Sequence, residues 1–169
     1  FPKDTKAIVT TADKFKINLS LVKSVIKSNR KRSLLLLDKV NEILKGKIKN
    51  KNISFLGVTF KANTDDMRGS SALVMIPSLA KKGAKINYYD PTGEKNYFKK
   101  IKNVNFSKDI KSAIYNSDLV IIHTEWNDFK SINFKSLIKK KSFIIYDMRN
   151  IYSPSKMKKA KIKYFGIGR

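Results

Sequence analysis

Residues 53–60 form a short apolar run, rich in β-branched and aromatic side chains, that stops abruptly at Lys61. Such a run is typical of a strand that is buried on both faces of a sheet. A second apolar segment begins at Ala72, has helical spacing and follows Ser70 and Ser71, residues that commonly begin a helix. A strand that leads into a helix in this way predicts an α/β fold, with a natural position for a phosphate at the start of the helix.

Strand and helix patterns alternate through the rest of the chain. Strands are predicted at 85–89, 103–106, 119–123, 143–146 and 163–167, and helices at 72–82, 109–116, 127–139 and 154–159. This alternation predicts βαβ units and therefore a doubly wound, mostly parallel sheet with helices on both faces.

The first 46 residues predict a helical segment that precedes the sheet. Residues 1–5 are expected to form a loop, one helix covers 7–15, and a second continues from about Asn18 to Lys45, where Gly46 ends it. A helix of about 25 residues is more typical of an element that bridges domains or subunits. We therefore predict two units, 1–46 and 47–169, and a homodimer formed through the long helix.

The chain is strongly basic, with 37 Lys and Arg against 13 Asp and Glu and a formal net charge of +24. Such a charge usually suggests nucleic acid or an anionic membrane as a partner. The lysines are spread along the sequence, however, and the abundance of Lys, Asn and Ile also fits an AT-rich genome. Because nucleic-acid binders usually cluster their charge on one face, nucleic acid is not the partner we expect first.

The composition also limits the chemistry and the location of the chain. It contains no cysteine, which excludes disulfides, thiolate metal sites and a cysteine nucleophile within these residues. The longest apolar run, four leucines at 34–37, is too short to cross a bilayer, and no signal-peptide pattern opens the sequence. We expect a cytoplasmic protein without a membrane partner. The first residue is Phe1 rather than Met, so we also expect an excised segment of a longer chain.

Three predicted strands end in conspicuously polar residues. These polar ends are Phe60-Lys61, His123-Thr124-Glu125-Trp126 and Asp147-Met148-Arg149-Asn150. Sheets of this kind bind ligands beyond the carboxyl ends of their strands. Lysine and arginine that converge there would suit a diphosphate or a sugar carboxylate, although ordinary solvated strand ends are the alternative.

Other candidate motifs favour structural roles. Asp65 and Asp66 would need further ligands to hold a metal, so we expect turn and hydrogen-bond roles for them and no metal site. His123 has no evident nucleophile partner, which favours a structural role over that of a catalytic base. No Gly-x-Gly-x-x-Gly motif follows a strand, so NAD cannot be placed on the usual glycine fingerprint.

The motifs together resemble the C-terminal portion of the UDP-glucose/GDP-mannose dehydrogenase family. The resemblance is carried by Phe60-Lys61, Thr64-Asp65-Asp66-Met67-Arg68-Gly69-Ser70, Tyr88-Tyr89-Asp90-Pro91, Thr124-Glu125-Trp126 with Phe129, Asp147-Met148-Arg149-Asn150 and Tyr164 with Gly166-Ile167-Gly168-Arg169. Phe1-Pro2-Lys3-Asp4 looks like the segment that follows the catalytic cysteine of the family, and Asn63 and Met67 look most like the UDP-glucose 6-dehydrogenase branch. Order and spacing agree over essentially the whole chain.

The resemblance implies a Rossmann-like domain of an NAD-dependent oxidoreductase that converts UDP-glucose to UDP-glucuronate for polysaccharide biosynthesis. In that family the oxidation proceeds by two hydride transfers through a cysteine-bound intermediate. This chain would supply recognition of the UDP-sugar and part of the cofactor cleft, while a missing N-terminal NAD-binding domain would supply the dinucleotide fold and the thiolate. The chain alone is therefore expected to be inactive.

By the same resemblance, particular residues acquire expected roles. The substrate-binding positions are Phe1, Phe60, Lys61 and Arg149; the catalytic positions are Lys3 and Asp4, with Asp4 orienting a water; and the positions near the cofactor pyrophosphate are Lys3 and Arg68. Met148 departs from the usual glycine before the arginine. The sugar could be glucose, N-acetylmannosamine or mannose, and a non-catalytic module that binds a nucleotide sugar or nucleic acid is the alternative function.

Overall fold

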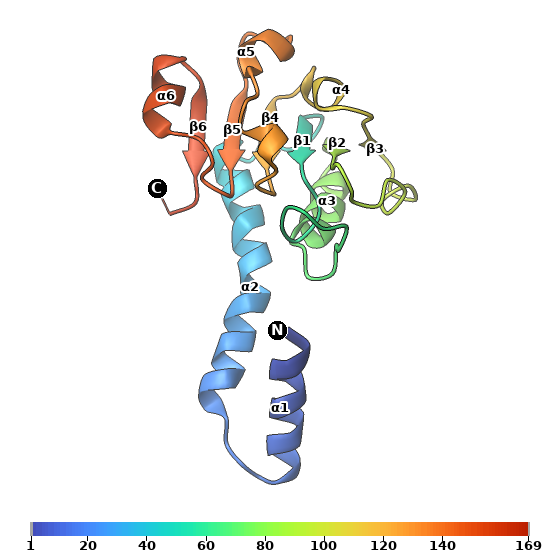
Figure 1. Cartoon of the computed structure of the whole chain (residues 1–169), viewed down its shortest axis with the longest axis vertical. Helices are drawn as coiled ribbons and strands as arrows, with labels where there is room; N and C mark the ends of the chain where they lie inside the picture. Colours follow the sequence, from blue (N-terminus) through green and yellow to red (C-terminus); the bar gives the residue numbers. More distant parts are fainter. Residues whose placement is uncertain (1, 169) are drawn as a thin grey trace.

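Six parallel strands form one sheet in the computed structural model, which describes residues 2–168 and, within them, every side chain except those of Pro2, Lys3 and Arg30. The strands are β1 (Asn52–Leu56), β2 (Lys85–Tyr89), β3 (Val104–Phe106), β4 (Leu119–Ile122), β5 (Ile144–Asp147) and β6 (Lys163–Gly166), in the order β3-β2-β1-β4-β5-β6. Each neighbouring pair is parallel. The chain starts at the centre and builds outward in both directions, which confirms the predicted doubly wound, Rossmann-like sheet (Figure 1).

Helices cover both faces of this sheet because its central strands are apolar on both sides. In β4, Leu119 and Ile121 belong to one core cluster, while Val120 and Ile122 belong to the other. The first cluster is covered by α3 (Ala72–Lys81) and by the C-terminal half of α2 (Ser20–Ile43). The second is covered by α4 (Ile110–Ile114), η1 (Asn127–Phe129), α5 (Phe134–Leu137) and α6 (Pro154–Lys159).

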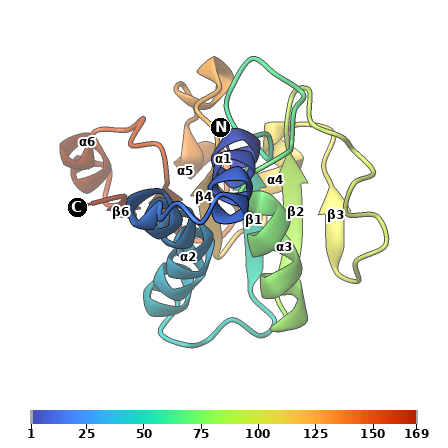
Figure 2. The same ribbon diagram turned by 90° about the horizontal axis from the view of Figure 1, so that it is seen from below.

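A helical hairpin of α1 (Pro2–Lys14) and α2 extends away from the sheet. The strands point toward this hairpin in Figure 1, so it projects from the side on which the strands end. We call that side of the sheet the carboxyl edge and the opposite side the amino edge. Seen from the hairpin end in Figure 2, α1 and α2 lie in front of the central strands, with β3 and α6 at the two sides.

The structure corrects the predicted start of α1 and the predicted end of β1. Pro2 begins α1 instead of lying in a loop, because proline is well tolerated in the first turn of a helix. The first strand ends at Leu56, although the apolar run continues to Phe60. Gly57 has a positive φ of +87°, which turns the chain out of the sheet.

The predicted helix at 127–139 is also wrong over most of its length. Only a 3₁₀ turn, η1, and the single turn α5 form, and residues 130–133 connect them. The buried side chains Phe129, Phe134 and Ile138 dock on the sheet as separate anchors, at spacings that one continuous helix does not place on a single face. None of the helices in the described part of the chain has the length and apolar content that a membrane span requires.

Candidate functional site at the carboxyl edge

The polar ends of β1, β4 and β5 meet at a cavity of about 400 Å³ between the carboxyl edge and the hairpin. Phe60, His123 and Arg149 line it from the sheet side, together with Ser70 and Ser71 at the start of α3. The other lining residues come mainly from the hairpin: Thr5, Lys6, Ile26, Asn29, Arg32, Ser33, Leu36 and Gly69. The cavity lies beside β1 and β4, where the strand order reverses, which is where doubly wound sheets bind their ligands.

Arg149 connects the three strand ends. Its Nε donates a hydrogen bond to the carbonyl oxygen of His123 (2.7 Å), and its Nη2 donates to the carbonyl oxygen of Phe60 (2.8 Å). Its Nε also lies 3.0 Å from Oε2 of Glu125 in an ion pair, and the side chain is 34% exposed. Nη1 has no hydrogen-bond partner among residues 2–168, so the anchored guanidinium keeps donors that an anion could use.

Lys61 lies beside this site and does not line the cavity. Its Nζ is 5.4 Å from the centroid of the Phe60 ring, a cation–π distance, and its carbonyl oxygen accepts a hydrogen bond from Oγ1 of Thr59 (2.9 Å). Phe60 itself is 40% exposed, which is unusual for a large aromatic side chain beside a core strand. The structure thus brings Phe60 and Arg149 together at the cavity and leaves Lys61 at its rim.

Two buried carboxylates hold the loops of the site, and neither was expected to do so from the sequence. Asp90, at the end of β2, accepts hydrogen bonds from the backbone N–H groups of Val58 (2.7 Å), Thr59 (3.2 Å) and Gly93 (2.8 Å). These contacts fix the chain that follows β1. The available signal was Asp90 before Pro91-Thr92-Gly93, because an aspartate that precedes such residues often bonds the backbone of its own turn.

Asp147 plays the same part at the end of β5. It is fully buried and accepts hydrogen bonds from the backbone N–H groups of Arg149 (3.0 Å) and Tyr152 (3.0 Å) and from the hydroxyl of Tyr164 (2.9 Å). Tyr152 in turn donates to the carbonyl oxygen of Phe129. Asp147 therefore sets the turn from which Arg149 points to the cavity.

His123 is neutral and makes one side-chain hydrogen bond. Its Nε2 lies 2.9 Å from Oγ of Ser71, while its Nδ1 is buried without a partner among the described residues. Burial, and secondarily the charge of Arg149, lower the pKa of His123 to about 3. A histidine with so low a pKa is a poor base, and no carboxylate orients Nδ1, so this pair does not form an activated serine nucleophile.

Buried polar atoms without hydrogen-bond partners concentrate in the four residues that follow β4. They are Nδ1 of His123, Oγ1 of Thr124, Oε2 of Glu125 and Nε1 of Trp126, as judged within the described part of the chain. The Glu125 oxygen faces Arg149 as an ion pair without hydrogen-bond geometry. Such atoms are rare in native proteins, because each costs about 1–3 kcal/mol, and they often mark contacts with groups outside the chain.

Two further predicted site residues that the structure describes, Asp4 and Arg68, do not line the cavity. Asp4 is exposed in the first turn of α1, next to Thr5, which lines the cavity. Arg68 is exposed and bonded to Asp66 by two nitrogens, Nε (3.0 Å) and Nη2 (2.8 Å), and these contacts raise the pKa of the guanidinium. Phe1 and the side chain of Lys3 lie outside the described residues. Within residues 2–168, no three His, Cys, Asp or Glu side chains form a metal-binding group.

Comparison with known proteins decides the family. Residues 54–154 match the family model described as "UDP-glucose/GDP-mannose dehydrogenase family, UDP binding domain". The chain belongs to this dehydrogenase family. The matched segment includes the last three residues of β1, all of α3, β4 and β5, and the residues that line the cavity from the sheet side.

Individual members of the family match over the whole chain. The UDP-glucose 6-dehydrogenase of Rickettsia conorii is 37% identical over 171 residues, which cover 99% of this chain and 40% of that protein. The enzyme of the same name from Rhizobium meliloti is 37% identical over 170 residues, covering 100% and 39%. The chain thus spans about two fifths of the length of these curated relatives.

Solved structures of the family share the fold. A UDP-glucose dehydrogenase from Pyrobaculum islandicum superposes with a TM-score of 0.76 at 23% identity, covering 98% of this chain and 36% of that one. An NDP-N-acetyl-D-galactosaminuronic acid dehydrogenase from Methanosarcina mazei superposes with a TM-score of 0.81 at 22% identity, covering 98% and 37%. The hairpin followed by the parallel sheet is therefore an arrangement that occurs in this family.

Proposed function

We propose that this chain is the C-terminal portion of an NAD-dependent UDP-glucose 6-dehydrogenase and that its carboxyl edge binds the UDP moiety of the substrate. The observation that carries the proposal is the anchored Arg149. Its guanidinium lines the cavity and is held by the carbonyl groups of two other strand ends. A cation fixed in this way can bind an anionic ligand with little further loss of side-chain entropy.

The side chains around Arg149 suit the parts of a nucleotide diphosphate. Arg149 would contact the diphosphate or its ribose, and the exposed ring of Phe60 offers an apolar surface to the base or sugar. Lys61 adds a second positive charge at the rim. The buried polar atoms at 123–126 that have no hydrogen-bond partner in the described part of the chain give further support, since ligand atoms or a neighbouring part of the enzyme would satisfy them.

The oxidation itself needs groups that this chain does not contain. Bound NAD would supply the hydride acceptor, and the reaction expected from the family resemblance would also need a cysteine thiolate, whereas these 169 residues contain no cysteine. We propose that Asp4, in the first turn of α1, orients a water next to the cavity. The nucleophile and most of the cofactor site would come from an N-terminal NAD-binding domain.

The fit to NAD is partial. Between Leu56 and Ala72 the chain forms a long loop rather than the compact glycine-rich turn that cradles a dinucleotide pyrophosphate. Arg68, exposed on this loop, could supply one cationic contact to the pyrophosphate. We therefore assign this chain one side of the cofactor cleft at most.

The organisation of the enzyme is part of the same proposal. Residues 1–46 would end a central dimerisation unit, and 47–169 would form the UDP-binding unit. The enzyme would be a homodimer that makes UDP-glucuronate for polysaccharide biosynthesis. The cytoplasm as its compartment stays a prediction from the sequence. A non-catalytic module that binds a nucleotide sugar would use the same site.

Calorimetric titration of the chain with UDP-glucose tests this proposal. Replacing Lys61 with alanine should weaken binding by about 1.5–3 kcal/mol, because a charge-assisted contact is lost. Lys61 is the better probe, since Arg149→Ala would also release the loops that Arg149 tethers. Lys108→Ala, which removes an equal charge from an exposed position outside the cavity lining, is the matched control. Equal affinities for the wild type and Lys61→Ala would reject the assignment of Lys61.

A further inference from the structure

Lysines precede every strand of the sheet except β4, and they gather at the amino edge. Because all six strands are parallel, the segments that lead into them arrive on one side of the sheet. These segments carry Lys45, Lys47, Lys49, Lys51, Lys81, Lys82, Lys85, Lys102, Lys139, Lys140, Lys141, Lys159, Lys161 and Lys163. Nearly all of these lysines are exposed, and Lys51 and Lys140 are half-buried.

The acidic residues of the sheet region lie almost entirely on the other side. Those that follow a strand, and so belong to the carboxyl edge, are Asp65, Asp66, Asp90, Glu94, Asp109, Glu125, Asp128 and Asp147. Two are exceptions: Glu42, near the end of α2 and three residues before Lys45, pairs with Lys39 (3.0 Å), and Asp118 directly precedes β4 at the amino edge. Oδ1 of Asp118 lies 2.7 Å from Nζ of Lys140 and 3.8 Å from Nζ of Lys51, so it is already neutralised.

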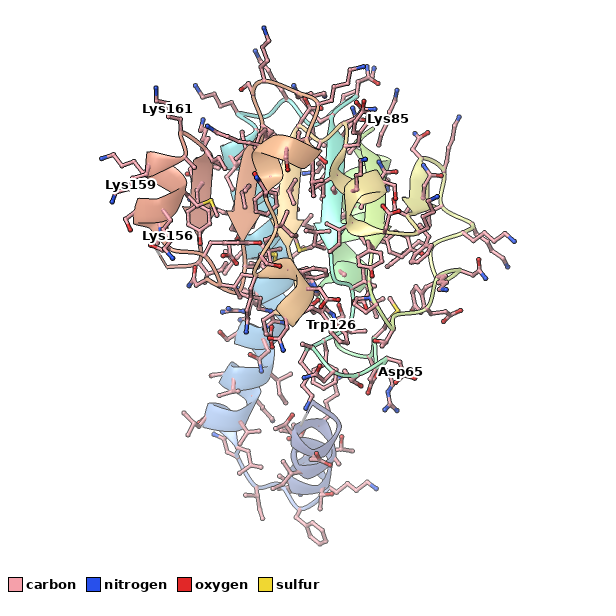
Figure 3. All side chains as sticks on the ribbon, turned by 45° about the horizontal axis from the view of Figure 1, so that its top comes forward. Asp65, Lys85, Trp126, Lys156, Lys159 and Lys161 are labelled. Atoms are coloured by element: carbon pink, nitrogen blue, oxygen red, sulfur yellow. The ribbon has the colours of Figure 1, made fainter. Side chains whose placement is uncertain are left out.

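The fold therefore separates charges that look evenly mixed along the sequence. Figure 3 shows Lys85 and Lys161 at the end of the molecule away from the hairpin, and Asp65 on the side that faces it. A compositional preference for lysine would raise its frequency on every surface, but it would not leave most of the carboxylates of the sheet region on one edge. A strongly positive edge of this kind attracts polyanions.

The positively charged amino edge also contains a hollow, which lies at the starts of β5 and β6. Its volume is about 390 Å³, and Ile138, Phe143 and Ile162 contribute apolar surface to it. The lysines that line it are Lys135, Lys139, Lys140, Lys141, Lys161 and Lys163. Beside it, the backbone N–H of Lys139 donates a hydrogen bond (2.8 Å) to the carbonyl oxygen of Tyr115, whose side chain is 43% exposed.

We propose that the amino edge is a binding surface for single-stranded nucleic acid, with RNA as the form to test. The lysines would contact phosphates along an edge of about 25 Å, the width of six strands. Tyr115 and the apolar wall of the hollow would receive bases, since single-strand binders combine a basic groove with aromatic stacking surfaces. An anionic membrane fits less well: firm attachment needs apolar insertion as well as charge, and Tyr115 is the one large apolar side chain exposed in the described segments that precede the strands.

Fluorescence anisotropy of the full chain with a labelled polyuridine of about 20 nucleotides tests this surface. The triple variant K139E/K141E/K161E should bind at least about tenfold more weakly, and the slope of log affinity against log salt should fall by about 2, for three lost phosphate contacts. The control K95E/K108E/K130E makes the same change of net charge at exposed positions that follow strands, away from the amino edge, and should lose far less. Circular dichroism would verify that both variants are folded.

Two further arms identify the ligand and the site. Tyr115→Ala should weaken binding about fivefold or more while Tyr115→Phe retains it, because stacking needs the ring and not the hydroxyl. Saturating UDP should leave RNA affinity unchanged, since the proposed UDP site lies at the opposite edge. The proposal would be overturned by equal losses in the two triple variants, by no binding to the polyuridine, or by binding to vesicles of phosphatidylserine and phosphatidylcholine in its place.

Discussion

Gly57 shows how one residue fixes the geometry of the carboxyl edge. Its φ is +87°, and a Cβ atom added there would lie 1.5 Å from Oγ1 of Thr124. The chain can therefore leave β1 and pass directly under the end of β4 only if position 57 lacks a side chain. Phe60 reaches the cavity because of that path, and Asp90 then holds the amides of Val58 and Thr59 in place.

Gly57→Ala should destabilise the fold by about 3 kcal/mol or more, because backbone strain and an overlap with Thr124 act together. Gly69→Ala is the matched control: its φ is +76°, but no atom lies within 4 Å of the added Cβ, so only the strain of about 1 kcal/mol applies. Urea unfolding of both variants measures the difference. An equal loss of unfolding free energy in the two variants would mean that the overlap with Thr124 adds nothing to the destabilisation at position 57.

The burial of His123 leads to a second prediction, which concerns how the stability of the fold depends on pH. The pKa of His123 is about 3 in the folded chain and near 6.5 when unfolded, so between these values only the unfolded state binds the proton. The contribution of neutral His123 to the free energy of unfolding is therefore fully present above pH 6.5. It decreases as the pH falls, by about 3 kcal/mol between pH 7 and pH 4.

The test compares the wild type with His123→Gln, which keeps a polar side chain facing Ser71. His123 is the only histidine, so the difference between the two pH profiles of unfolding free energy isolates its titration from that of the carboxylates. The variant should lose less stability than the wild type on acidification. Parallel profiles would show that His123 titrates normally in the folded chain.

At the scale of elements, the hairpin exposes more apolar surface than a helix needs to pack on one sheet. Leu21 is 78% exposed and Phe15 is 73% exposed, and Ile8, Ile17, Val25, Leu34 and Leu35 are exposed as well. Apolar surface of this extent usually has a partner. We expect the hairpin to form the subunit interface of the proposed homodimer.

Analytical ultracentrifugation, which measures the oligomeric state, tests this expectation. The wild type should sediment as a dimer at high concentration, and L21D/V25D should shift it toward the monomer, because two charges would be buried on one face of α2. Val74→Asp, which alters an exposed position on α3, should leave the dimer intact. A monomeric wild type would contradict the assignment of the interface.

Some helices and strands could be predicted from sequence patterns alone, and others could not. β2 and α6 have the predicted bounds, since strand alternation and a proline in the first helical turn are local signals. The predicted helix at 127–139 failed because Phe129 and Phe134 are held by tertiary contacts, which local periodicity does not report. The positions of Asp90 and Asp147 as loop anchors depend on chain segments that meet only in the fold.

For the molecule as a whole, the two edges of the sheet carry different chemistry. The cavity of the carboxyl edge could be anticipated, because Phe60 and His123 end predicted strands, Arg149 follows one, and parallel strands end together. The segregation of charge could not be anticipated from the sequence, because the lysines are distributed along the chain and become neighbours only when the starts of the strands align in the sheet. The family match identifies the type of domain. The proposal that this chain binds UDP is supported by the residues around the cavity at the carboxyl edge.

The most direct test of that proposal is a two-dimensional amide NMR titration of the chain with UDP. Chemical-shift changes should concentrate at 57–71, 123–126 and 147–150, where the three strand ends surround the cavity, and Arg149 Nε should shift with them. The amides of Lys51, Lys85 and Lys141 at the amino edge should not move. Shifts confined to the amino edge, or no saturable change at all, would contradict a UDP site at the carboxyl edge.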